Sequence, residues 1–247
     1  MKTLLQRAPD AACVYVADTA NFPYGEKTHE QVVDCVKALV QKICEKFNPK
    51  VIVVACNTMS VNALEAVRKT FPAVQFGGTV PTIKLAASVP KIRRIGLLAT
   101  HATCENPYNL KLKEKFASDC EIINRPDPEL ISFIEHNAFT ASREECLKAV
   151  KPAVDFFRRE KCDVVILGCT HFLNFTEVFE EACGPDLKVV DSVDGVVRHA
   201  LEVLEGGVAG GEPALFITGF RDREEENQYN VLCSRFGIKF GGLLSKK

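Results

Sequence analysis

The chain has 247 residues, enough for one large domain or two modest ones and for a sizeable buried core. Hydrophobic residues make up 47% and charged residues 26% of it, which excludes a disordered or fibrous protein. The formal net charge is -1, from 31 basic and 32 acidic side chains, so we expect neither nucleic acid nor a membrane surface as a partner.

The sequence shows no targeting or membrane-spanning segment. Its longest fully apolar run, 51–56, is far shorter than the roughly 20 residues that a transmembrane helix needs. The N-terminus reaches Gln6 and Arg7 before any apolar stretch forms, so it is not a signal peptide and we expect a cytoplasmic protein. The 11 cysteines include no Cys-x-x-Cys pair, which argues against a zinc ribbon or a disulfide framework.

In the first part of the chain, strands are predicted to alternate with helices. A strand over 14–17 precedes a helix that begins after Thr28, where Thr28-x-x-Gln31 forms a capping box, and ends before Pro49. The run 51–56 is continuous and β-branched, as expected for a parallel strand buried on both faces. A second helix follows this strand.

The same alternation returns further along the chain. The expected elements are, in order, a strand at 95–100, a helix at 108–116, a strand at 120–123, a helix opened by the capping box of Ser142 and Glu145, and a strand at 164–169. We expect the closing segment, 213–219, to form a strand that returns to the sheet of the first half.

The chain is an imperfect repeat. The segment VIVVACNT (51–58) matches VVILGCTH (164–171), which places Cys56 and Cys169 at equivalent positions. A repeat of this length suits an α/β half-protein. We therefore predict an α/β fold with two similar domains, 1–90 plus 192–247 and 91–191, whose parallel sheets are related by pseudo-twofold symmetry, with the active site in the cleft between them.

The repeat also predicts a strand that the first half does not contain. Segments 1–8 and 13–18 correspond to the helix and strand that follow 95–100 in the second half, but nothing corresponds to 95–100 itself. We expect either that the chain starts inside the fold or that its true start lies upstream.

Two cysteines at equivalent strand ends are the main chemical signal. Parallel sheets present ligands at the C-terminal ends of their strands, where the following helices aim their N-termini. A thiol at a helix N-terminus can have its pKa lowered from about 8.5 toward 7 or below, so Cys56 and Cys169 could both act as bases. Facing halves would place them on opposite sides of a ligand, which is the geometry of a two-base racemase or epimerase. Two alternatives stay open: both are core cysteines, or Cys56, Cys169 and His171 bind a metal.

Four segments resemble a known family, the glutamate racemases of the aspartate/glutamate racemase superfamily. They are ADTANFPYGEKT (17–28), VVACNTMSVNAL (53–64), LGCTHF (167–172) and FITGF (216–220). The resemblance runs from about Leu4 to the C-terminus. It implies an enzyme that interconverts L- and D-glutamate without a cofactor or metal and supplies D-glutamate for peptidoglycan. Glutamate is the expected small-molecule partner, and a homodimer is one candidate assembly.

The resemblance also implies roles for individual residues. Cys56 resembles the base that acts on D-glutamate and Cys169 the base that acts on L-glutamate; Glu135 resembles a carboxylate that assists Cys169. His171 is expected both to act as an acid or base beside Cys169 and to hold the substrate. The residues expected to bind substrate are Tyr24, Gly25, Asn57, Thr58, Thr170 and His171. Asp18 and Asp191, which each follow a strand, are interpreted as loop or capping residues.

One feature of the family has no counterpart here. Its members open with a strand that ends in Asp-Ser-Gly, and this is the strand that the internal repeat also lacks. The sequence therefore leaves two hypotheses: an active racemase, or a catalytically impaired amino-acid-binding or regulatory protein with the same fold.

Overall fold

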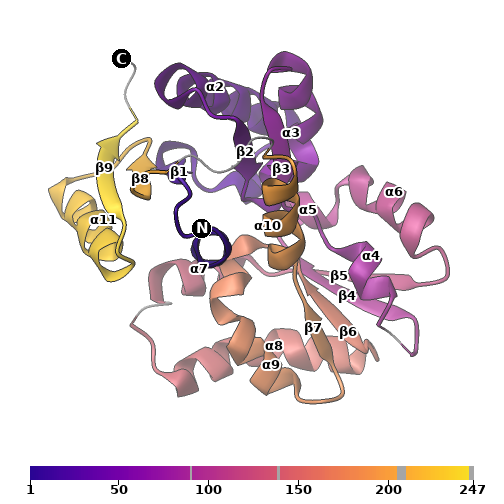
Figure 1. Ribbon diagram of the computed structural model, residues 1–247. Helices are drawn as coiled ribbons and strands as arrows, with labels where there is room; N and C mark the ends of the chain where they lie inside the picture. The colour runs from indigo at the N-terminus through magenta and orange to yellow at the C-terminus, as the bar shows by residue number, and fades with distance from the viewer. Residues whose placement is uncertain (90, 138–139, 205–209, 245–247) are drawn as a thin grey trace.

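The computed structural model describes residues 1–89, 91–137, 140–204 and 210–244. Their strands form three parallel sheets, in the orders β1-β8-β9, β2-β3 and β5-β4-β6-β7 (Figure 1). The strands are β1 (Val14–Ala17), β2 (Val51–Val54), β3 (Gln75–Gly78), β4 (Arg94–Ala99), β5 (Glu121–Pro126), β6 (Val164–Leu167), β7 (Lys188–Val190), β8 (Ala214–Ile217) and β9 (Lys239–Leu243). The predicted α/β class with parallel sheets is confirmed.

Helices follow most of these strands. The α-helices are α1 (Lys2–Arg7), α2 (His29–Phe47), α3 (Asn57–Thr70), α4 (Ile83–Ala87), α5 (His101–Cys104), α6 (Pro107–Phe116), α7 (Pro128–Asn137), α8 (Arg143–Arg159), α9 (Thr176–Cys183), α10 (Val193–Glu202) and α11 (Arg223–Arg235). Three 3-10 helices complete the set: η1 (Thr19–Asn21), η2 (Tyr24–Glu26) and η3 (Thr170–Phe175). None of the described helices is long and apolar enough to cross a membrane.

Both predicted capping boxes are confirmed. The Thr28 side chain accepts a hydrogen bond from the Gln31 backbone while the Gln31 side chain bonds back to Thr28, and α2 starts there. Ser142 and Glu145 do the same at the start of α8. Capping depends only on residues within one turn, so the sequence alone located both helix starts.

The sheet of the second half forms the most deeply buried part of the molecule. Its strand β4 pairs with both β5 and β6, and all four residues of β6 are buried. Helix α8 packs Val150, Val154 and Phe157 into this core. A Cβ on Gly96 would lie 2.5 Å from the Phe157 ring, so the strand and the helix approach closely because position 96 has no side chain.

Strand β2 is less buried than the sequence predicts. Val54 is buried, but Val51, Ile52 and Val53 are only half-buried. In the described residues β2 pairs only with β3, and β1 lies in a separate sheet, whereas the equivalent strand β6 has neighbours on both sides. The expectation of burial on both faces was wrong for three of the four residues of β2, and among the described residues one edge of this strand has no partner strand that could shield it from solvent.

The closing segment returns to the first half as predicted. Strand β8 pairs in parallel with β1, with Ala214 opposite Val14 and Ile217 opposite Ala17. Strand β9 then adds to the other edge of β8, and α11 packs Cys233 against Leu215 and Ile217. This sheet lies apart from the β4–β7 sheet in Figure 1.

One predicted helix begins differently from the expectation. The α-helix after Cys56 starts at Asn57, but Cys169 is followed first by the 3-10 helix η3, and α9 starts only at Thr176. The division into domains and the cleft between them stay predictions, and residue 90, at the expected boundary, lies outside the described residues.

Candidate active site

The two cysteines occupy equivalent positions in the structure. Cys56 follows β2 and is the N-cap of α3, and Cys169 follows β6 and is the N-cap of η3. The negative charge of Cys169 raises the pKa of Cys56, so the two residues lie within electrostatic reach of each other. Both backbones are extended at the cysteine, which is the conformation of an N-cap residue.

The pKa of Cys56 moves opposite to the sequence-based expectation. The desolvation caused by surrounding protein raises it to about 12, although part of the residue is accessible. Hydrogen bonds from the Met59 and Thr58 backbones lower it, while the neighbouring Cys169 raises it further. Desolvation therefore outweighs the helix N-terminus here, and Cys56 carries its proton at neutral pH.

Cys169 has a different setting. Its Sγ lies 3.4 Å from Nδ1 of His171, and Nε2 of His171 lies 2.8 Å from Oε2 of Glu135 on α7. The second contact joins residues that are 36 positions apart in the chain. The structure thus brings together Cys169, His171 and Glu135, three residues that the sequence proposed for catalysis.

The charges of His171 and Glu135 stabilise each other. Burial alone lowers the pKa of His171, but its hydrogen bonds to Cys169 and Glu135 and the negative charge on both raise it to about 10. The hydrogen bond from His171 lowers the pKa of Glu135, against the opposing effect of burial. An imidazolium in this position donates to the carboxylate through Nε2–H and to the sulfur of Cys169 through Nδ1–H.

The loop from Asp18 to Thr28 is held by hydrogen bonds to the Asp18 carboxylate. The Asp18 carboxylate accepts hydrogen bonds from the hydroxyls of Tyr24 and Thr218 and from the Asn21 amide. Burial and this bond to Asp18 raise the pKa of the Tyr24 phenol, so it stays protonated and donates. Asp18 is therefore a loop residue that fixes Tyr24, and Asp191 caps α10 by accepting from the Val193 backbone at 2.8 Å.

Gly25 occupies a position where a side chain has little room. A Cβ there would lie 3.0 Å from Cγ2 of Thr100, the residue that caps α5. The loop of the first half consequently sits directly against the start of α5 in the second half. The structure places Gly25 at a junction between the two halves.

The Asn57 side chain has a buried amide donor that forms no hydrogen bond with the described residues. Its side chain is 4% exposed, and its Nδ2 is buried without a hydrogen-bond partner among the described residues. A buried unpaired amide donor costs about 1 to 3 kcal/mol. This donor lies directly after Cys56 and suits a ligand oxygen such as a carboxylate. Thr170, beside Cys169, is half-buried.

Thr58 takes part in a hydroxyl cluster that the sequence did not predict. Its Oγ1 lies 2.9 Å from Oγ1 of Thr100 and 3.3 Å from Oγ1 of Thr103, and Thr100 also bonds Thr103 at 3.0 Å. Asn62 on α3 bonds Asn106 near α6 in the same region. The cluster links α3 to α5. Its only sequence signal is Thr100, which ends the strand of the second half that the repeat identified.

Two aromatic residues of the first half also belong to this neighbourhood. The Phe22 ring centroid is 6.0 Å from that of His171. Tyr15 on β1 is 39% exposed, and desolvation together with the negative charges of Cys56 and Glu135 raises the pKa of its phenol. Both aromatics lie in or beside segments that the sequence singled out, but nothing in their spacing distinguished them from packing residues.

The metal alternative gains no support from the geometry. Across the described ranges, no group of three or more His, Cys, Asp or Glu side chains is arranged to hold a metal ion.

The sequence of the chain is similar to those of proteins in one known family. The family model for Asp/Glu/Hydantoin racemases matches residues 1–200. A glutamate racemase of Treponema pallidum is 36% identical over 239 residues, which cover 96% of this chain and 89% of that protein. One from Proteus mirabilis is 31% identical, covering 96% of this chain and 83% of that protein.

Solved structures agree with the sequence comparison. The crystal structure of Escherichia coli glutamate racemase, in complex with L-glutamate and the activator UDP-MurNAc-ala, has a TM-score of 0.84 and 29% identity and covers 98% of this chain and 91% of that chain. The glutamate racemase of Aquifex pyrophilus, with a TM-score of 0.74 and 24% identity over 98% of this chain and 92% of that chain, shares the fold.

Proposed function

Because the chain belongs to the Asp/Glu/Hydantoin racemase family, we propose that it is a glutamate racemase that interconverts L- and D-glutamate by proton transfer at the α-carbon. The observation that carries this proposal is the placement of Cys56 and Cys169 at equivalent strand ends of the two halves, within electrostatic reach of each other. The Escherichia coli relative, whose structure contains L-glutamate, supports the choice of substrate.

The reaction needs one base and one acid on opposite faces of the substrate. A cysteine thiolate takes the α-proton and forms S–H, and the electron pair of the broken C–H bond passes into the adjacent carboxylate system. The opposite cysteine thiol then gives its proton to the other face of the carbon and becomes a thiolate. The proton count is conserved, and the two cysteines have exchanged protonation states.

The two thiols differ in a way that favours one resting state. Cys56, with its pKa raised to about 12, is the thiol and proton donor. Cys169 lies beside the His171 imidazolium, whose Nδ1 is 3.4 Å from its sulfur. We assign L-glutamate as the substrate of this resting state, with Cys169 as its base, and D-glutamate as the substrate of the reversed state, with Cys56 as its base.

Substrate binding uses neutral donors. The Nδ2 of Asn57 is placed to meet a carboxylate, and the helix N-termini after both cysteines favour negative charge. We assign Tyr24, Gly25, Thr58, Thr170 and His171 to the walls around the substrate. Glu135 acts through His171 as a positioning residue.

The biological setting follows from the family resemblance. We infer that the D-glutamate is used for peptidoglycan and that the enzyme works in the cytoplasm. A homodimer remains one candidate assembly.

The test is to incubate chelator-treated protein with L-glutamate in deuterated water and to follow optical rotation and deuterium at the α-carbon. We expect the rotation to fall to zero while deuterium enters both enantiomers. Racemisation of aspartate but not glutamate would reject the substrate. No exchange with any amino acid would reject the enzyme and favour the catalytically impaired binding protein.

A further inference from the structure

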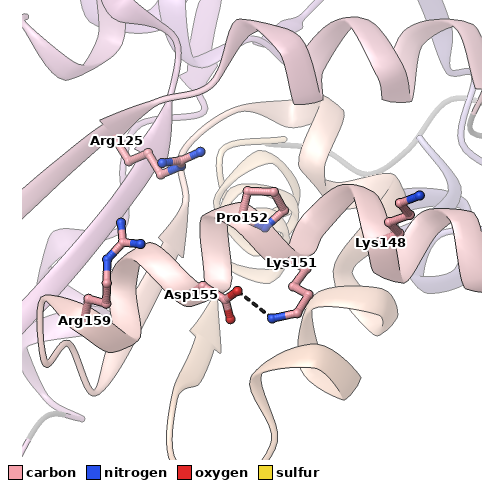
Figure 2. Close-up of a pocket in the computed structure, with 6 residues that line it drawn as sticks. All are labelled: Arg125, Lys148, Lys151, Pro152, Asp155 and Arg159. Atoms are coloured by element: carbon pink, nitrogen blue, oxygen red, sulfur yellow. Dashed lines mark hydrogen bonds and ion pairs between the residues drawn. The ribbon is translucent and has the colours of Figure 1, made fainter.

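A basic hollow lies on the exposed side of α8. It has a volume of about 510 Å³ (Figure 2), and it is lined by Arg125, Lys148, Lys151, Pro152, Asp155 and Arg159. None of these residues belongs to the cysteine site. Four of the lining side chains are cationic and one is a carboxylate, so the hollow carries an excess of positive charge.

The lining residues of α8 form one stripe. Positions 148, 151, 152, 155 and 159 recur every three or four residues and therefore share a helix face. The opposite face carries Val150, Val154 and Phe157, which are buried in the core. In the middle of the stripe, the compact ring of Pro152 takes the place of a long side chain and leaves the space between the charged groups open (Figure 2).

Arg125 contributes a fixed cation from a different element. Its Nε and Nη2 bond to Oδ2 of Asp127 at 3.1 and 2.9 Å, and its guanidinium lies 5.1 Å from the centre of the Phe156 ring. Asp127 is itself held because its Oδ1 accepts from the Leu130 backbone. A guanidinium that is already oriented loses little conformational freedom when it binds an anion.

The carboxylates near the hollow leave part of the positive charge available. Asp155 pairs with Lys151 at 2.5 Å, and this bond lowers the pKa of Asp155. Lys148 and Arg159 make no hydrogen bond or ion pair with any described residue. The charge of Arg159 also lowers the pKa of Asp155, and the N–H groups of both side chains remain available to an external anion.

The size of the hollow selects the class of ligand. Its volume falls in the range of small-molecule sites, about 300 to 1,000 Å³. Glu144 lies one helical turn before Lys148 on the same face, so negative charge bounds the stripe at its N-terminal end. A compact anion fits this pattern, whereas an extended polyanion such as nucleic acid would meet this carboxylate.

We propose that this hollow binds a small phosphorylated molecule whose phosphate groups carry at least two negative charges. Arg159 supplies a guanidinium group that matches phosphate oxygens, Arg125 supplies the N–H groups that do not bond Asp127, and Lys148 supplies a point charge. The proposal rests on the charges and shape of α8 and β5 and does not depend on the proposed racemase function.

The test is calorimetric titration of the full chain with inorganic pyrophosphate at low salt. We expect saturable binding at one site per chain. The double variant Lys148→Gln, Arg159→Gln should weaken it by about tenfold or more, because two charge-assisted contacts are lost. The matched control is Lys50→Gln, Lys111→Gln, which removes two exposed lysines elsewhere and should retain wild-type affinity.

Four results would overturn the proposal. They are the absence of saturable pyrophosphate binding to the wild-type chain, equal affinity in the double variant and the wild type, competition between pyrophosphate and glutamate, and tighter binding of a single-stranded oligonucleotide than of pyrophosphate. Equal circular dichroism of the two double variants would show that both are folded, since all four positions are exposed.

Discussion

At the residue scale, the two cysteines have equivalent places in the chain but unequal surroundings. Cys56 has only backbone donors to offset its desolvation, and its pKa is raised to about 12. Cys169 has the His171 imidazolium, which Glu135 holds in turn. A symmetric repeat has therefore produced an asymmetric pair of acid–base groups, and single substitutions should show this.

Replacing either cysteine by serine should abolish racemisation. A serine hydroxyl is far too weak a base, so Cys56→Ser and Cys169→Ser should each lose activity by about 10²- to 10⁴-fold, the usual contribution of a general base. The measurement is the initial rate in both directions. Cys44→Ser, on the outer helix α2, is the control and should keep wild-type activity.

The division of labour between the thiols can be tested with the same variants. Each should still eliminate HCl from one enantiomer of a β-chlorinated glutamate analogue, because this reaction needs only one base. Racemisation at the wild-type rate by either variant would refute the two-base mechanism. Loss of elimination from both enantiomers in both variants would remove the support for one base per face.

Removal of the Glu135 carboxylate should shift the alkaline limit of activity. The pKa of His171 is raised from 6.5 to about 10, so its charged form and the stability it contributes are fully present below pH 6.5 and are lost as pH rises through about 10. In Glu135→Gln the pKa of His171 falls, so the rate with L-glutamate should decline at lower pH than in the wild type.

At the acid limit of activity, the contribution of Glu135 is lost as the pH falls rather than as it rises. The pKa of Glu135 is lowered from 4.5, so its contribution is present above that pH and is lost as pH falls. Rate–pH profiles of the wild type, Glu135→Gln and the exposed control Glu114→Gln measure both effects. Superimposable profiles for all three would show that Glu135 has only a structural role.

At the element scale, the two equivalent strands differ in what lies beside them. Gly168 directly follows β6 beside β4, and a Cβ there would lie 2.6 Å from Cδ1 of Leu97 and 3.1 Å from the Leu98 carbonyl oxygen. The matching residue in the first half, Ala55, is exposed and already carries a Cβ. The small residue before each cysteine is thus required by packing in one half only.

Gly168→Ala should therefore destabilise the protein by about 1 to 3 kcal/mol, the usual cost of overpacking a tight core. Ala55→Gly, which changes the same position of the repeat, should cost about 1 kcal/mol or less. Chemical denaturation measures both free energies of unfolding. Equal and small losses in the two variants would contradict the packing argument.

At the scale of the whole molecule, hydroxyl groups join the two halves close to the site. Thr100 caps α5 and bonds Thr58 on α3, and Gly25 of the 18–28 loop lies against it. These contacts hold elements that carry or adjoin Cys56 against the second half. The distance between the halves should therefore depend on this cluster.

Thr100→Val keeps the shape of the side chain but removes its hydroxyl. We expect a loss of about 1 to 2 kcal/mol in the free energy of unfolding, from the lost cap and the lost bond to Thr58, together with a higher KM for glutamate. The control is Thr70→Val at the exposed end of α3, where the hydroxyl bonds only within its own helix. Unchanged stability and unchanged KM in Thr100→Val would show that the cluster does not link the halves.

The sequence by itself determined the features that depend on near neighbours. The capping boxes at Thr28 and Ser142 and the alternation of strands and helices were predicted because caps and hydrophobic periodicity are local. The repeat located Cys56 and Cys169 at equivalent strand ends for the same reason. The resemblance added Glu135 and the substrate-binding role of His171.

Only the tertiary structure decided the features that depend on what surrounds a residue. The contact of Glu135 with His171, the link from Thr58 to Thr100 and the exposed edge of β2 all join or separate segments far apart in the chain. The pKa of Cys56 is the clearest case: a helix N-terminus predicted a lowered value, but the protein packed around the thiol raises it. Burial is a property of the folded chain, and here its desolvation cost exceeds the local stabilisation that the sequence could show.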